Sequence, residues 1–100
     1  MLSGSGEADY ELAARLSEEA AQVPPGSQDV LTIPFLAGSG SPYYNDRDRG
    51  AILGIQTAVT RGVLFRSMLE GVSCNLRQTL EIFEKLLGGP LERIVLAEAA

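Results

Sequence analysis

The clearest pattern in the chain is a helical repeat of large apolar residues between Thr60 and Leu87. At 100° per residue these side chains fall within one arc of ~160°, with Val72 near its centre. They are Leu64, Phe65, Met68, Leu69, Val72, Leu76, Leu80, Ile82, Phe83, Leu86 and Leu87, and the opposite side carries Arg66, Ser67, Glu70, Arg77, Gln78, Glu81, Glu84 and Lys85. Thr60 is a suitable N-cap, and Gly88-Gly89-Pro90 ends the pattern. We therefore expect a long helix that packs its apolar arc on a sheet, so that an Asp at position 72 would unfold the protein.

A second helical pattern covers residues 7–22, which are rich in Ala, Leu and Glu. Leu12, Leu16 and Val23 lie near helical spacing, and Pro24-Pro25-Gly26 stops the pattern. The Gly- and Ser-rich residues 1–6 are interpreted as a flexible lead-in.

Three short apolar segments have the composition of strands: residues 29–36, residues 51–55 and residues 94–97. The long helix lies between the second and the third, which favours a right-handed βαβ crossover and a parallel strand pair. The pattern thus predicts an α/β fold of two helices and about three strands.

Residues 38–50 contain too many turn-forming residues for regular structure. Loops of this length in a compact domain usually carry function or serve an interface. This segment is therefore the first place to look for a site.

Composition excludes several functions. The chain has 100 residues, a formal net charge of −5, no His and one Cys. Negative charge argues against nucleic acid as a partner, and no apolar run reaches the length of a membrane span. Without His, neither a Ser-His-Asp triad, Cys-His chemistry nor a His-ligated zinc site is possible within the chain. No secretory signal is recognisable at the N-terminus, so we expect a soluble, cytoplasmic protein.

The order of the motifs resembles the FGGY family of carbohydrate kinases. Leu31-Thr32-Ile33-Pro34-Phe35-Leu36-Ala37-Gly38, then Pro42-Tyr43-Tyr44, then Arg49-Gly50-Ala51-Ile52-Leu53-Gly54-Ile55 are similar to one ordered stretch of that family. Arg66-Ser67-Met68-Leu69-Glu70-Gly71-Val72 resembles the helix that follows it. The resemblance covers most of the chain, and its specificity comes from the series of motifs with matching gaps.

The resemblance implies a partial ribonuclease H-like, actin-like ATPase domain, with residues 7–100 forming part of the C-terminal domain. The parent enzymes transfer the γ-phosphoryl group of ATP to a sugar or polyol hydroxyl with the help of Mg²⁺. Their catalytic base and phosphate-binding turn match no residue here, so we expect no catalytic, cofactor-binding or metal-binding residue in this chain and no activity in isolation. The expected partners are the remainder of the kinase or further copies of the chain.

The same resemblance implies that the loop is a cleft or interdomain segment, through Gly38, Pro42, Tyr43, Asn45, Arg49 and Gly50. Tyr43 is interpreted either as a wall of a sugar site or as a ring that pins the loop. For Arg49 the alternatives are a cation near the cleft and an ordinary solvated turn residue.

Several positions depart from the family pattern. Gly38-Ser39-Gly40 stands where many members have Gly-Glu-Arg, Asn45 where Asp is common and Val63 where a polar residue is typical. Glu98-Ala99-Ala100 replaces the expected Gly-rich adenosine turn after residues 94–97.

Two further residues on the long helix have side chains that can take part in chemistry. Glu70 lies on the polar side and is interpreted as a solvated or interdomain ion-pair residue rather than a catalytic acid. Cys74 also lies on that side, without a neighbour that would activate its thiol.

Two other functions stay open beside the kinase segment. One is a non-catalytic interaction or assembly module derived from the actin-like fold. Glu98-Ala99-Ala100 favours this module if it is genuine sequence in place of the Gly-rich turn, and favours the kinase segment if the given chain merely ends there. The other is an unrelated α/β binding domain, which requires the series of motifs to be coincidental.

Overall fold

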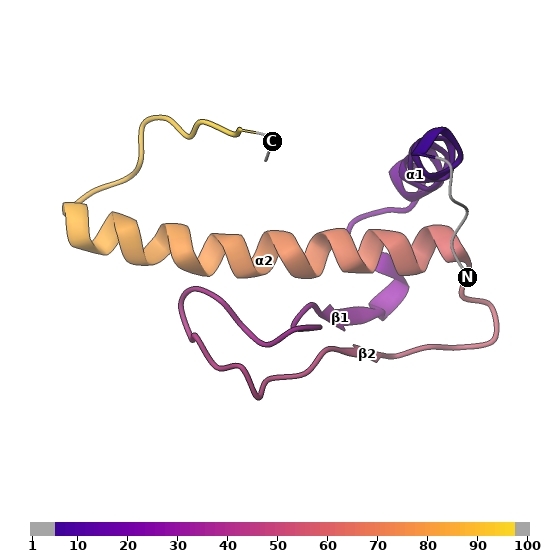
Figure 1. The fold of residues 1–100 in the computed structure, drawn as a ribbon, viewed down its shortest axis with the longest axis horizontal. Helices are drawn as coiled ribbons and strands as arrows, with labels where there is room; N and C mark the ends of the chain where they lie inside the picture. Colours follow the sequence, from indigo (N-terminus) through magenta and orange to yellow (C-terminus); the bar gives the residue numbers. More distant parts are fainter. Residues whose placement is uncertain (1–5, 98–100) are drawn as a thin grey trace.

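The computed structural model describes residues 6–97 and places one long helix at the centre of the fold (Figure 1). The elements follow in the order α1 (Gly6–Ala21), a short turn of three residues (Ser27–Asp29), β1 (Leu31–Ile33), β2 (Ala51–Leu53) and α2 (Arg61–Leu87). In Figure 1 the two strands run below α2, and α1 lies above its N-terminal end. The two predicted helices are confirmed, each within one residue of its expected ends.

Local signals explain where α2 begins and ends. The Thr60 hydroxyl accepts a hydrogen bond from the Val63 N–H at 3.3 Å, which satisfies one of the free amides of the first turn. At the other end Gly88 is left-handed, with φ 81°, and its N–H donates to the Glu84 carbonyl. Glycine adopts this conformation without a Cβ penalty, so the helix stops at Leu87.

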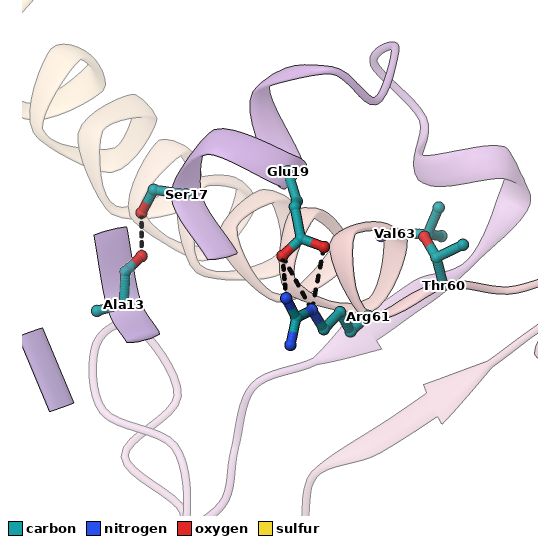
Figure 2. A network of polar contacts seen from close by, with 6 residues as sticks. All are labelled: Ala13, Ser17, Glu19, Thr60, Arg61 and Val63. Carbon is teal, nitrogen blue, oxygen red and sulfur yellow. Dashed lines mark hydrogen bonds and ion pairs between the residues drawn. The ribbon is translucent and has the colours of Figure 1, made fainter. Parts of the chain in front are cut away.

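α1 packs against the first turns of α2 at a glycine. A Cβ on Gly62 would lie 3.1 Å from the Cβ of Glu19, so the small residue permits the close approach. The Arg61 guanidinium also reaches the Glu19 carboxylate, with Nε 3.0 and 2.9 Å from its two oxygens (Figure 2). Ala20 on α1 is buried.

β1 and β2 form an antiparallel pair, with Leu31 opposite Leu53 and Ile33 opposite Ala51. Both strands precede α2, so the chain turns back through the intervening loop instead of crossing over a helix. The predicted parallel pair joins residues 51–55 with residues 94–97 across the long helix, and it is wrong because residues 94–97 form no strand among the described residues. Residues 94–97 are exposed and form no strand, because a strand needs a hydrogen-bonded neighbour and the described residues offer none there.

β1 packs on α2 through small and polar residues. The hydroxyls of Thr32 and Ser67 are buried and lie 2.7 Å apart, and a Cβ on Gly71 would lie 2.4 Å from the Thr32 carbonyl oxygen. Val63 is the buried apolar residue on this helix. The first turns of α2 therefore use their small side chains to reach the strand.

Most of the apolar arc of α2 is exposed among the described residues, contrary to expectation, and only Leu64, Phe65 and Leu80 are half-buried. Val72 is 56 % exposed, and large apolar side chains remain open to solvent along the helix, including Leu69, Leu76, Phe83 and Leu86. The prediction that Val72 lies in a buried core is therefore wrong for this chain. A side chain on the apolar arc is buried only if another element covers it, and the two short strands pack on another side of α2.

The proposed lead-in begins outside the described residues. Gly6, its last residue, is the first residue of α1.

Candidate functional site

The segment between the strands is an ordered loop closed by Ser39 and Asn45. The Ser39 N–H donates to the Asn45 carbonyl at 2.9 Å, and the Asn45 N–H donates to the Ser39 hydroxyl at 3.0 Å. Gly38 is left-handed, with φ 88°, and a Cβ there would lie 2.7 Å from the Cα of Asp46. The two ends of residues 38–46 therefore meet only because position 38 is glycine.

The tip of the loop presents two tyrosines. The N–H groups of Tyr43 and Tyr44 both donate to the Gly40 carbonyl, which makes a tight turn around Pro42. The Tyr43 ring meets Phe35 edge to face, with centroids 6.5 Å apart, and remains more than half exposed. This contact agrees with a ring that pins the loop and leaves one face open.

Asn45 and Arg49 stabilise the second half of the loop. The Asn45 Oδ1 accepts the Arg47 N–H at 3.0 Å, and the Arg49 guanidinium donates to the carbonyls of Asp46 and Asp48, both at 3.1 Å. Arg49 therefore binds its own backbone, as a turn-holding residue does.

Gly50 allows the loop to return to β2 beside β1. A Cβ at this position would lie 2.8 Å from a methyl carbon of Leu36 and 3.2 Å from the Ile33 carbonyl oxygen. The role of the six predicted residues as a cleft or interdomain segment stays a prediction.

A groove of about 850 Å³ lies between β1, the start of the loop and α2. Of the six predicted residues only Tyr43 lines it. Its floor includes Thr32 and Ser67, and Cys74 and Gln78 lie along its α2 wall. The Ser41 hydroxyl, 3.2 Å from the Thr79 hydroxyl, ties the loop to the middle of α2.

Two polar groups beside this groove have distinct surroundings. The Asn75 Oδ1 is buried without a hydrogen-bond partner among the described residues. The Ser27 hydroxyl, the Gly26 N–H and the Arg66 guanidinium hold the pKa of Glu70 below its ordinary value. Glu70 therefore bonds within its own chain, and an interdomain ion pair for it stays a prediction.

Within residues 6–97 no three His, Cys, Asp or Glu side chains gather where they could hold a metal ion. Glu98-Ala99-Ala100, the expected substitute for the adenosine turn, lies outside the described residues. Within residues 6–97, neither helix is long and apolar enough to cross a membrane.

Comparison with known proteins gives the family. The sequence model described as "FGGY family of carbohydrate kinases, C-terminal domain" matches residues 3–97. The chain belongs to the FGGY family of carbohydrate kinases. The predicted membership, and with it the partial actin-like α/β fold, is confirmed.

Individual FGGY relatives carry different names. The chain is 30% identical to a xylulose kinase of Lactococcus lactis over 80% of this chain and 16% of that protein. It is 35% identical to glycerol kinase 2 of Thermotoga maritima over 69% of this chain and 14% of that protein. The crystal structure of xylulose kinase from Rhodospirillum rubrum superposes with a TM-score of 0.69 and 29% identity, over 87% of this chain and 16% of that one. The chain therefore spans about one sixth of the length of these kinases.

Sequence reasoning found the loop but missed the residues that shape it. Ser39 closes the loop and Glu70 accepts hydrogen bonds from the turn before β1, yet neither contact has a signal in the residue pattern. Both depend on contacts between positions far apart in the chain, 44 residues in the case of Gly26 and Glu70. The glycines at positions 38 and 50 were the feature of the sequence that could have indicated the close contacts of the loop.

Proposed function

We propose that this chain acts as part of the C-terminal domain of an ATP-dependent sugar or polyol kinase and is inactive by itself. The FGGY match over residues 3–97 carries the proposal. The named relatives are a xylulose kinase and a glycerol kinase, so both a sugar and a polyol are suitable test substrates. Because the reaction draws on ATP, we place it in the cytoplasm.

Inactivity of the isolated chain is supported by what its residues can supply. Phosphoryl transfer depends on positioning and on stabilising the charge of the transferred group, tasks that bound ATP and Mg²⁺ share with protein groups. The described residues contain no carboxylate cluster for the metal, and the loop's Arg49 donates to its own backbone. We therefore assign this chain a structural part in the kinase.

The natural partner in this proposal is the remainder of the kinase domain. The chain spans about one sixth of its relatives, and the apolar arc of α2, with Leu69, Val72, Leu76 and Phe83, is exposed. A continuous apolar face of this kind marks a surface that another element covers. Isolated chains are expected to cover it by self-association.

The nucleotide test is a calorimetric titration of the full chain with MgATP, followed by a phosphoryl-transfer assay with xylulose and with glycerol. We expect no binding heat up to millimolar MgATP and no phosphorylated product. Saturable binding with a Kd below ~1 mM, about 4 kcal/mol, would contradict the proposal. Product formation would contradict it independently.

The alternative is a non-catalytic assembly module, favoured by Glu98-Ala99-Ala100 in place of a Gly-rich turn. The two functions differ in how nucleotide affects the complex with the partner. A kinase part should form a complex in which MgATP binds, whereas an assembly module should form one that ignores MgATP. Sedimentation of the reconstituted complex with and without MgATP separates them.

A further inference from the structure

The turn before β1 has a backbone that non-glycine residues seldom adopt. Four consecutive residues have positive φ: Gly26 at 98°, Ser27 at 48°, Gln28 at 52° and Asp29 at 68°. Left-handed conformations are disfavoured for side chains with a Cβ, so a run of three such residues requires external support. Backbone support comes from the Asp29 and Val30 N–H groups, which donate to the Gly26 and Ser27 carbonyls, and from the Ser27 N–H, which donates to the Pro24 carbonyl at 3.3 Å.

The external support comes from Glu70 on α2. Its Oε2 accepts the Gly26 N–H at 2.9 Å, and its Oε1 accepts the Ser27 hydroxyl at 2.5 Å. Ser27 has no exposed surface, whereas the Glu70 side chain is 29% exposed. Each carboxylate oxygen of Glu70 thus accepts a hydrogen bond from one of two adjacent residues of the turn.

The position of β1 depends on this turn. Val30 and Thr32, which follow it directly, are buried, and Thr32 bonds Ser67 one helical turn before Glu70. On the other side, a Cβ on Gly54 would lie 2.5 Å from the Asp29 carbonyl oxygen, so the turn also abuts the end of β2. A change of the turn would therefore shift both strands relative to α2, and with them both ends of the loop that they flank.

We infer that Glu70 is a positioning residue, whose carboxylate holds residues 26–29 in the left-handed conformation and thereby sets the place of β1 and of the loop on α2. A plain surface ion pair with Arg66, 3.3 Å away at Nε, is the competing explanation. The positioning role and the surface ion pair differ in which hydrogen-bond partners of Glu70 are important. A positioning role depends on Gly26 and Ser27, whereas a surface pair depends on Arg66.

The positioning role is pH-dependent, and its sign follows from the pKa of Glu70. That pKa is lowered in the folded chain by the Ser27 hydroxyl, the Gly26 N–H and Arg66. A lowered folded-state pKa gives stabilisation that is present above the unfolded value and is lost as the pH falls through the folded value. Asp29, Tyr43 and Cys74 are ionisable residues that line the same groove as Glu70. The turn is therefore expected to open in acid.

The test compares Glu70→Gln with Glu81→Gln in the full chain. Glu81 also pairs with an Arg four residues away but is exposed and touches no turn, so it matches the charge change. Amide hydrogen exchange at Asp29 and Val30 should become about tenfold faster in Glu70→Gln and stay unchanged in Glu81→Gln. Across an acid titration, the chemical shift of the Gly26 amide, which donates directly to Glu70, should follow Glu70 in the original chain and lose this transition in Glu70→Gln.

Two further variants keep the test decisive if Glu70→Gln fails to fold. Ser27→Ala removes one bond and should raise the pKa of Glu70, measured from its carboxyl carbon shift. Arg66→Gln should leave the exchange of Asp29 and Val30 within twofold. The inference is wrong if Arg66→Gln reproduces the exchange of Glu70→Gln, if Ser27→Ala leaves the pKa of Glu70 in place, or if these amides are unprotected in the original chain.

Discussion

The two sides of α2 differ in residue size and in what they contact. One side presents Gly62, Val63, Ser67 and Gly71, all buried against α1 or β1. The other presents the apolar arc, where Leu69, Val72 and Phe83 are exposed. The difference shows that the chain's own contacts depend on small residues that allow close approach, while its largest apolar surface stays exposed among the described residues.

The largest effect expected from this comparison is at Val63. Val63 is 1% exposed, so Val63→Asp would bury an unpaired carboxylate and should lower the free energy of unfolding by about 3 kcal/mol or more. Val72→Asp is the matched control, because Val72 is on the exposed side and should change it by at most about 0.5 kcal/mol. Urea denaturation of both variants checks the prediction. If Val72→Asp lowers the free energy of unfolding as much as Val63→Asp, the side of α2 that carries Val72 is buried and the comparison of the two sides is wrong.

A smaller effect is expected at Gly71, which tests the close approach directly. A Cβ there would lie 2.4 Å from the Thr32 carbonyl oxygen. Gly71→Ala should cost roughly 3 kcal/mol in steric strain and recover roughly 1 kcal/mol in helix propensity, for a net loss of about 2 kcal/mol. Gly40→Ala is the control, since no atom lies within 4 Å of its Cβ. If thermal or urea unfolding finds Gly71→Ala as stable as the original chain, the helix and β1 are not in contact at this point.

Much of the fold was predictable where local signals dominate. Both helices follow from their periodicity and from the stop signals at Pro24 and Gly88, and two strands were found within the expected segments. The direction of strand pairing was not predictable, because a short apolar segment does not reveal its neighbour. The missing strand at residues 94–97 has the same cause.

The candidate site was predictable only as a segment. Turn-forming composition located the loop, and the glycines at positions 38 and 50 are required by close contacts. The pattern of α2 could not show that its apolar arc lies away from β1, because periodicity identifies a face and not its partner. Glu70 was placed on the polar side for the same reason, although its carboxylate is bonded to a turn far away in sequence.

Sedimentation velocity over a range of concentrations tests the central claim most directly, namely that the apolar arc of α2 is a surface to be covered. The isolated chain should associate as its concentration rises, because Leu76 and Phe83, 47% and 51% exposed, are apolar and unprotected. A variant with Leu76→Lys and Phe83→Lys should sediment as a monomer with unchanged helix content. Glu81→Gln with Glu84→Gln makes the same change of net charge and should still associate. A sharp monomer at every concentration for the original chain, with cooperative unfolding, would contradict the account.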